Sequence, residues 1–418
     1  MTSVKKNSFI IFVCMFLQAV PFGIAQNVQP LFIPYVLEKF HFSLASFSLI
    51  FTVGVLAAAL FAPFFSKLFD RIPIKLIFII GSTLSSLGFL AFGFARNLFQ
   101  FYFFSAILQI GCAIFSGLGV PYVINHWFPK EGRGRALGMA FAGGFIGNIF
   151  LQKITSQLLA AKGISYSYIL LGAVALASSL PVILLFIRLP KHGEITDNHR
   201  TPKPAEDAKL QGPSAAEIKK NRFFWLFGVA FAIISISISA LSTQYATYFT
   251  GELKMSPSLV GTLGSIFALF CLFGNVLGGL LFDQRGSFQT MAISFVLQAT
   301  AIVALLLTPK LYGFAFLFSI SYGLNVFSYM SAPAFMSSDI FGKRDANVKL
   351  AIIKLFFAVG FALGSTLFGA VTDHFGFGIG WGMLLACTIL GYALLLIAIR
   401  KVKKQMIGGN SRGENHLL

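Results

Sequence analysis

Two groups of six long apolar segments run through this 418-residue sequence and restrict what it can fold into. Each segment covers the roughly 20 residues that an α-helix needs to cross the hydrocarbon core of a bilayer. Inside that core only helices and closed barrels satisfy every backbone polar group. Because 56% of the residues are hydrophobic and only 11% are charged, the chain lies outside the range of soluble globular proteins. We therefore predict an all-α membrane protein with twelve transmembrane helices in two pseudo-symmetric six-helix bundles. The predicted spans lie near 10–36, 45–66, 76–95, 99–124, 136–159, 166–187, 223–249, 257–282, 288–308, 311–336, 348–371 and 379–399.

One long polar interval separates the two groups of spans. Its Pro, Gly and charged residues cannot bury a core, so we expect it to be a flexible linker. The predicted organisation is an N-terminal half at 1–188, the linker at 189–222, a C-terminal half at 223–399 and a tail at 400–418.

The formal net charge of +18 comes from Lys and Arg residues in short clusters between the apolar segments. Positive charge in short loops marks the cytoplasmic side of a membrane protein, so the pattern places both termini and the linker in the cytoplasm. The same clustering argues against a nucleic-acid-binding role. We expect a multi-pass protein of the inner (cytoplasmic) membrane of the cell.

A short motif recurs at equivalent places in the two halves, as SKLFDR at 66–71 and as GLLFDQR at 279–285. A third copy around Asp373 falls on the opposite face of the membrane, as an inverted three-helix repeat would place it. A small residue lets two helices approach closely, and an Asp at a helix end can accept backbone N–H groups or pair with an Arg. We interpret the motif as a gating clasp; the alternative is a charged hairpin between two spans. The predicted clasp residues are Asp70, Arg71, Asp283 and Arg285.

The six-plus-six layout, the central loop and this Gly-x-x-x-Asp-x-x-Gly type of motif resemble the major facilitator superfamily over nearly the whole chain. Ser66 and Ile72 stand where glycine is usual. The resemblance implies the major facilitator fold and a transporter, working by rocking of two halves about a midplane site. No nucleophile–base set or phosphate-binding Gly loop indicates an enzyme. We expect a monomer in contact with membrane lipids.

Two predicted cytoplasmic segments carry a finer resemblance. The sequence NHWFPKEGRGRALG at 125–138 and the sequence SDIFG at 338–342 are similar to segments of the oxalate–formate antiporters and their monocarboxylate-transporter relatives. The resemblance implies a small organic anion as substrate. From these two segments we add Arg133 and Asp339 to the predicted gating residues.

Charged side chains within the spans bear on the substrate. In the oxalate antiporter an Arg and a Lys contact the substrate. The matching positions of this sequence hold Asn275 and Phe357, and the loss of both charges argues against oxalate itself. Lys354 lies about one helical turn from Phe357. The sequence has no Asp, Glu or His in the middle of a span, although a pump driven by a buried carboxylate needs one. Lys153 and Lys354 do lie within spans. A substrate carboxylate would supply their counter-charge; alternatively, each lysine could extend to the membrane interface.

The resemblance also implies that spans one, four, seven and ten line the transport path. Hydroxyl and amide side chains there can orient a carboxylate by hydrogen bonds. Hydrogen bonding between helices explains each of them equally well. The complete set of predicted substrate contacts is Lys354, Lys153, Gln26, Asn27, Gln29, Gln109, Tyr245, Tyr322, Asn325 and Tyr329.

These observations predict a secondary active transporter of small, monocarboxylate-like organic anions. Proton symport and exchange for a counter-anion are both compatible with the sequence. The alternative is an exporter of amphipathic or hydrophobic compounds, favoured if both lysines extend to the interface. The four cysteines stand within apolar segments and show no metal-ligand spacing, so we expect no metal and no cofactor.

Overall fold

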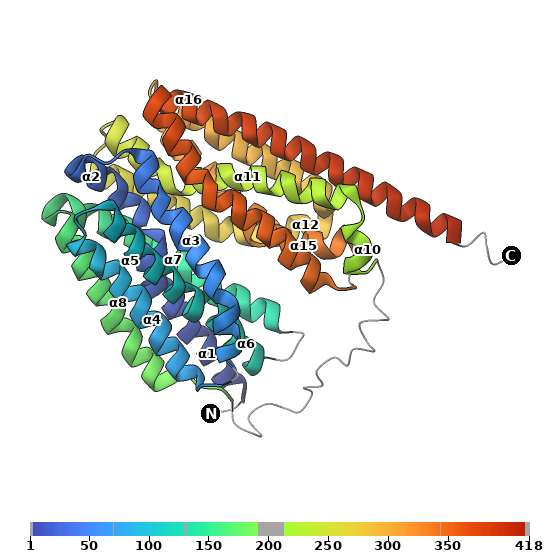
Figure 1. The fold of residues 1–418 in the computed structure, drawn as a ribbon, viewed down its shortest axis with the longest axis horizontal. Helices are drawn as coiled ribbons and strands as arrows, with labels where there is room; N and C mark the ends of the chain where they lie inside the picture. Colours follow the sequence, from blue (N-terminus) through green and yellow to red (C-terminus); the bar gives the residue numbers. More distant parts are fainter. Residues whose placement is uncertain (1–2, 70, 129–131, 191–212, 343, 414–418) are drawn as a thin grey trace. The chain divides into compact units, whose positions relative to one another are not determined.

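Every regular element of the computed structural model, over the residues that it describes, is a helix (Figure 1). The described residues are 3–69, 71–128, 132–190, 213–342 and 344–413.

Ten of the described helical stretches are long and apolar enough to cross a membrane. Two of them, Pro257–Leu307 and Val348–Lys403, contain 51 and 56 residues, more than twice what one crossing needs. Each is interrupted by a glycine in the left-handed region, Gly286 with φ 70° and Gly376 with φ 81°. Glycine adopts this conformation easily because it lacks a Cβ. Divided at these two glycines, the ten stretches provide the twelve predicted crossings.

The first six crossings are built from helices that are interrupted in two places. In the first crossing a π-helical segment contains Pro21, whose missing N–H cannot continue the α-helical ladder. A second π-helical segment lies in the fourth crossing. The elements are α1 (Ser3–Leu17), η1 (Gln18–Asn27), α2 (Gln29–Phe40), α3 (Leu44–Leu68), α4 (Ile74–Ala91), η2 (Phe92–Phe94), α5 (Leu98–Cys112), η3 (Ala113–Gly119), α6 (Val120–Trp127), α7 (Arg133–Lys162) and α8 (Ile164–Phe186).

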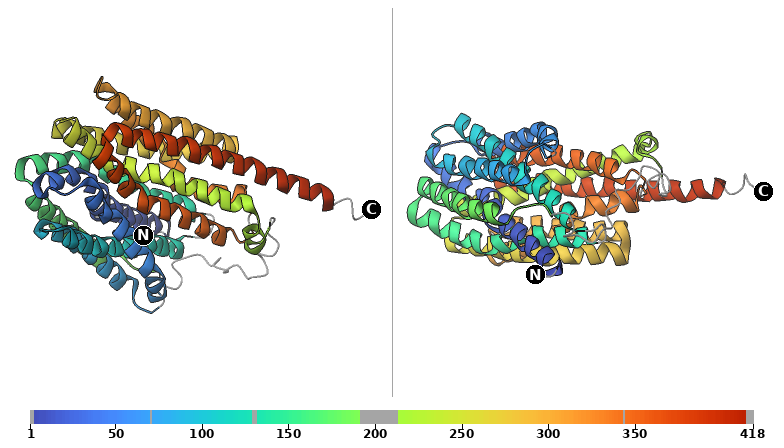
Figure 2. Two further views of the ribbon diagram at one scale, coloured as in Figure 1. Left: turned by 45° about the horizontal axis from the view of Figure 1, so that its top comes forward. Right: turned by 90° about the horizontal axis from the view of Figure 1, so that it is seen from below.

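The second six crossings include one helix that is broken in the middle. The helix of the tenth crossing is interrupted at Asn325 and again at Ser331. Figures 1 and 2 show the last helix, α16, folding back on itself. The elements are α10 (Ala215–Lys219), α11 (Arg222–Thr247), η4 (Tyr248–Glu252), α12 (Pro257–Leu307), α13 (Gly313–Leu324), α14 (Phe327–Met330), α15 (Ala332–Asp339) and α16 (Ala346–Gly413).

The chain divides into two compact units. Unit 1 contains residues 1–199 and 242–269, and unit 2 contains residues 200–241 and 270–418. Each unit holds most of one predicted half. The exception is the stretch Ser242–Leu269, which comes from the second half of the sequence and belongs to unit 1.

The two units use the same packing device. In unit 1, Gly143 and Gly147 of α7 lie against the backbone carbonyls of Met15 and Ala19, so closely that a Cβ at either position would collide with them. In unit 2, Gly360 and Gly364 of α16 lie in the same way against carbonyls of α11. Pairs of small residues four apart allow such close helix contacts in membranes. Crossings five and eleven therefore make equivalent helix contacts in their two units, in line with the predicted internal repeat.

The end of the predicted linker is structured, which corrects the expectation that all of 189–222 is flexible. Ser214 and Glu217 form a reciprocal capping box at the start of α10, and such a box stabilises a helix N-terminus. Ile218 is 3% exposed and packs into the apolar core of unit 2. Residues 191–212 lie outside the described ranges.

Candidate functional site

A buried polar cluster in unit 1 is centred on Gln152 of α7. Its Nε2 donates to the backbone O of Asn27 at 2.9 Å and to Oδ1 of Asn148 at 3.0 Å, and its Oε1 accepts a bond from the Tyr245 hydroxyl at 3.0 Å. Gln152 is 1% exposed and Tyr245 is 3% exposed. We call these four residues the Gln152 cluster. It ties η1, α7 and the C-terminal end of α11 together, and both amide hydrogens of Gln152 are used.

The stretch Ser242–Leu269 makes further bonds within unit 1. Gln244 Nε2 donates to Ser48 Oγ of α3 at 2.9 Å, and the Ser156 hydroxyl donates to the backbone O of Pro257. A Cβ at Gly264 would collide with the Gln152 side chain. These contacts fix the ends of α11 and α12 to the helices of the first half.

The other predicted contacts of the first crossing also bond to their own unit. Gln26 and Gln109 exchange reciprocal amide hydrogen bonds between η1 and α5. Gln29 Nε2, at the start of α2, donates to Ala25 O of η1 in the same crossing at 2.9 Å. The structure therefore brings the predicted residues of crossings one and four together, in bonds between and within helices.

A second buried polar cluster lies in unit 2. Asn325 Nδ2 donates to Gln298 Oε1 at 3.2 Å, and Asn325 Oδ1 accepts from the Ser294 hydroxyl at 2.6 Å. Gln298 Nε2 donates to Thr388 Oγ1 at 3.1 Å, and the Tyr392 hydroxyl donates to Gln298 Oε1 at 3.2 Å. We call these five residues the Gln298 network. Of them only Asn325 was predicted from the sequence, because crossings nine and twelve were not expected to line a path.

Two predicted tyrosines of unit 2 have different surroundings. The Tyr322 hydroxyl donates to Ile238 O of α11 at 2.8 Å and is 1% exposed. The ring of Tyr329 stacks on Phe357 with centroids 6.5 Å apart, and Phe357 stacks on Phe361 at 5.6 Å. Tyr329 therefore belongs to an aromatic face that α14 and α16 form together.

Lys354 lies beside this aromatic face. Successive residues of an α-helix are about 100° apart, which puts Lys354 within ~60° of Phe357 and Phe361. The lipid-facing stripe of α16 is marked by Leu355, 62% exposed, and Val359, 51% exposed, and by the same spacing both lie ~100° or more from Lys354. Lys354 is itself exposed, and no ion pair joins it to a carboxylate in the described ranges. Its ammonium is placed away from the lipid stripe, and no carboxylate among the described residues pairs with it.

Lys153 has the opposite placement. It is exposed on α7, and by the ~100° spacing it lies within ~60° of Phe150, which is 64% exposed. Ile154, 53% exposed, continues this face. The geometry favours the interface alternative for Lys153, and its contact with a substrate stays a prediction.

The predicted gating residues differ in exposure. Arg71, Asp283 and Arg285 are exposed, while Asp70 lies outside the described residues. Arg133 is half-buried, and its Nε donates to the backbone O of Phe128 at 2.9 Å, which joins the start of α7 to the end of the preceding crossing. The gating roles of these residues stay predictions.

Asp339, the sixth predicted gating residue, joins three crossings of unit 2. Its carboxylate accepts bonds from the hydroxyl and the backbone N–H of Ser287, which starts the ninth crossing, and from Lys403 Nζ at 3.1 Å. Burial raises the pKa of Asp339, but the bonds from Ser287 and Lys403 outweigh that effect and leave the pKa below its ordinary value. The carboxylate thus caps a helix N-terminus, where negative charge is favoured.

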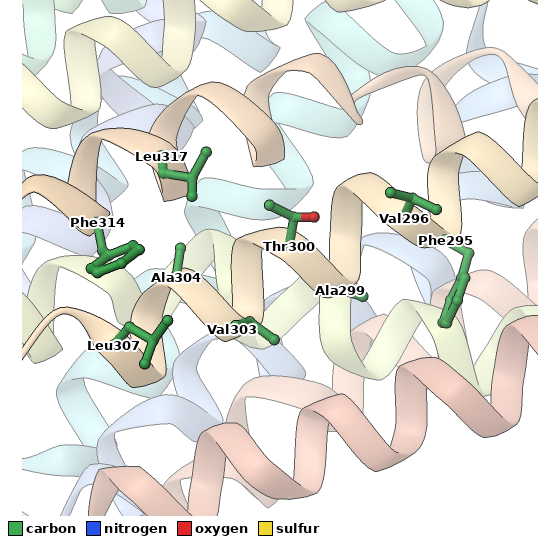
Figure 3. A pocket seen from close by; sticks show the side chains of 9 residues that line it. All are labelled: Phe295, Val296, Ala299, Thr300, Val303, Ala304, Leu307, Phe314 and Leu317. Carbon is green, nitrogen blue, oxygen red and sulfur yellow. The ribbon is translucent and has the colours of Figure 1, made fainter.

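Two other features bear on what this protein can bind. A groove of about 310 Å³ lies between the second half of α12 and α13 (Figure 3). Thr300 is the one polar residue in its lining, so the groove carries no charged side chain to pair with a carboxylate. Within the described ranges, no three His, Cys, Asp or Glu side chains lie close enough to share a metal ion.

Comparisons with known proteins agree with the fold. The family model of the Major Facilitator Superfamily matches residues 11–325 and 227–416 of this chain. Multidrug resistance protein MdtG of a Rahnella species is 24% identical over 74% of this chain and 74% of its own length. Human Monocarboxylate transporter 12 is 21% identical over 84% of this chain and 73% of its own length.

A solved structure of a bacterial homologue of the human lysosomal transporter Spinster superposes with a TM-score of 0.75. It covers 96% of this chain and 98% of its own, at 17% identity. This likeness supports the major facilitator fold, and the two relatives are transporters. The chain is therefore a multi-pass membrane transporter that belongs to the Major Facilitator Superfamily.

Proposed function

We propose that this protein is a secondary active transporter of small organic anions, of monocarboxylate type, with both termini in the cytoplasm. In this proposal it lies as a monomer in the cytoplasmic membrane and alternates between two states by rocking of its halves. The observation that carries the proposal is the position of Lys354.

Lys354 supports an anionic substrate because its ammonium lies within a crossing and off the lipid stripe. An ammonium in that setting needs a counter-charge or water, and no described carboxylate provides one. The aromatic face of Tyr329, Phe357 and Phe361 next to it would accommodate the apolar part of a small acid. The monocarboxylate-transporter relative agrees with this choice.

The mode of coupling follows from what the crossings contain. In the described ranges the acidic residues lie at helix ends or in connections. A proton carried inward would therefore travel on the substrate itself or change the charge of a lysine. Exchange of one anion for another needs no proton at all, and the proposal includes both.

A second candidate is export of amphipathic or hydrophobic compounds. The specific observation in its favour is the aromatic surface of unit 2, where Phe231 also lies 5.8 Å from Phe357 between ring centroids. The MdtG relative is in line with it. In this case Lys354 would have no ligand role.

The first test is thermal unfolding of the purified protein with a panel of ligands. A ligand that binds only the folded state, at 100 times its Kd, adds about 2.7 kcal/mol of stability. We expect small monocarboxylates to raise the Tm, and lipophilic cations and neutral drugs to leave it unchanged. Stabilisation by the drugs alone would replace the anion proposal with the exporter.

A matched pair of lysine variants then tests the site. Lys354→Ala should abolish the carboxylate-dependent rise in Tm and reduce uptake into proteoliposomes by more than about tenfold, since a lost ion pair in a desolvated site costs at least that much. Lys354→Arg should keep part of both. Lys153→Ala removes the same charge from the exposed side of α7 and tests the predicted contact there: unchanged uptake would leave Lys153 at the interface, and reduced uptake would add it to the site. Equal uptake in all of them would remove Lys354 from the site.

Uptake under two gradients separates the modes of coupling. A proton gradient should drive accumulation if the transporter is a symporter. If the transporter is an exchanger, uptake should be faster into vesicles that are preloaded with a second carboxylate.

A further inference from the structure

Lys349 is a fully buried cation that the sequence interpretation did not single out. It is 0% exposed and stands in the first turn of α16. Its ammonium donates to three backbone carbonyls, Phe341 O at 2.5 Å, Pro213 O at 2.8 Å and Gly342 O at 3.3 Å. An ammonium has three N–H donors, so each of them has an acceptor.

These acceptors come from two separate segments of unit 2. Phe341 and Gly342 lie in the connection between crossings ten and eleven, whereas Pro213 belongs to the predicted linker and is its first described residue after 190. The Lys349 side chain therefore holds the end of the linker against the base of crossing eleven. We call Lys349 and its three acceptors the Lys349 clamp.

A second bond strengthens the same contact. The carboxylate of Asp345 accepts a hydrogen bond from the Ala215 N–H at 2.9 Å, at the start of α10. Asp345 has φ 51°, in the left-handed region that residues other than Gly adopt infrequently. Its backbone O accepts bonds from the N–H groups of Val348 and Lys349.

Opposing effects act on the charge of the buried Lys349 ammonium. Burial disfavours this charge most, and the Arg344 guanidinium adds to that effect, whereas the carboxylates of Asp345 and Glu217 attract the ammonium. Breaking a buried charge arrangement by removing one partner is strongly destabilising, so the docked linker end has a firm attachment.

We propose that Lys349 is a positioning residue for Lys354, the anion contact of the proposed function, on which this inference rests. Lys354 follows Lys349 by five residues, ~7.5 Å along the helix axis at 1.5 Å per residue. The clamp fixes where crossing eleven starts, and it thereby fixes the position of the Lys354 ammonium. Loosening the clamp leaves the Lys354 side chain unaltered but moves its ammonium away from the position in which it binds a substrate carboxylate.

The test combines transport kinetics with hydrogen–deuterium exchange of the purified protein. Lys349→Met keeps the length of the side chain and removes its charge. We expect it to raise the KM for a small carboxylate by about tenfold with a smaller change in kcat, since the loss is one of substrate binding. The peptide 213–219 should exchange faster. Lys349→Arg should restore part of both.

Two further variants keep the result interpretable. Asp345→Asn loosens the contact from the other side and should have the same, weaker effects if Lys349→Met fails to fold. Lys354→Ala should impair uptake without changing exchange of 213–219.

Each outcome overturns a different statement. Unchanged exchange of 213–219 in the Lys349 and Asp345 variants overturns the clamp, whatever the uptake. Faster exchange with an unchanged KM overturns the positioning role. Unchanged uptake in Lys354→Ala overturns the proposed function, whatever the exchange.

Discussion

The hydroxyl of Tyr245 donates a hydrogen bond to Oε1 of Gln152 at 3.0 Å, although the two residues are 93 positions apart and come from different predicted halves. Both side chains are buried in unit 1. If the predicted halves rock as the transport proposal requires, this bond must open in the other state. The bond should therefore stabilise the described state and slow the transition from this state to the other.

A double-mutant cycle with Tyr245→Phe and Gln152→Leu tests this bond. Hydrogen bonds between transmembrane helices contribute about 0.6 kcal/mol on average, and we expect a coupling energy of that size or larger from unfolding in bicelles. Tyr166→Phe makes the same chemical change at a half-exposed position and should be neutral. A coupling energy of zero would show that the bond contributes nothing.

The glycine contacts between crossings predict position-dependent effects within one helix. Gly147→Ala places a methyl group against the Ala19 carbonyl of the neighbouring helix and should cost about 1–3 kcal/mol of stability, the usual range for overpacking. Gly138→Ala, where nothing lies within 4 Å, should be neutral or stabilise α7 by up to about 1 kcal/mol. Gly360→Ala should repeat the Gly147 result in unit 2. Equal unfolding temperatures for all three would contradict the close helix contacts.

Asp339 predicts a dependence of stability on pH. Its pKa in the folded protein is lowered, because the bonds from Ser287 and Lys403 outweigh burial. A carboxyl whose folded pKa is depressed contributes stability above its unfolded pKa of about 3.9, and the contribution is lost as the pH falls through the folded value. The Tm advantage of the unmodified protein over Asp339→Asn should thus be full at pH 6, begin to decrease near pH 4 and be lost only once the pH falls below the lowered folded pKa of Asp339.

The matched control for that measurement is Asp283→Asn. Asp283 is exposed, so its substitution should leave the acid part of the Tm profile unchanged. As a predicted clasp residue, it should instead slow transport while carboxylate binding persists. A Tm difference between the unmodified protein and Asp339→Asn that stays constant from pH 6 to pH 3 would mean that the carboxylate of Asp339 is not the titrating group.

Much of the fold was readable from the sequence because membrane crossing depends on length and apolar content alone. The twelve predicted crossings are confirmed once the chain is divided at Gly286 and Gly376. The superfamily prediction is confirmed by the family match. Hydropathy does not distinguish the faces of a helix, so it could not tell Lys354 from Lys153.

The parts that were missed depend on contacts between distant residues. In the sequence, Lys349 is one of several positive charges next to a predicted cytoplasmic loop. Its burial depends on the contact of its ammonium with the backbone O of Pro213, 136 residues away, which the local sequence does not indicate. Gln298 stands four residues after Ser294, and Tyr392 stands four residues after Thr388, so each pair lies on one face of its helix. They were missed because crossings nine and twelve were not expected to line a path. The short helix at Ala215–Lys219 was missed because its stability comes from a capping box and from Ile218, which docks on the core of unit 2.

The turns at Gly286 and Gly376 restrict the topology of this protein in the membrane. A single left-handed glycine joins crossing eight to nine and crossing eleven to twelve, so each connection is too short to span a bilayer. The two crossings of each pair therefore run in opposite directions. The orientation of the last crossing follows from that of the crossing before it.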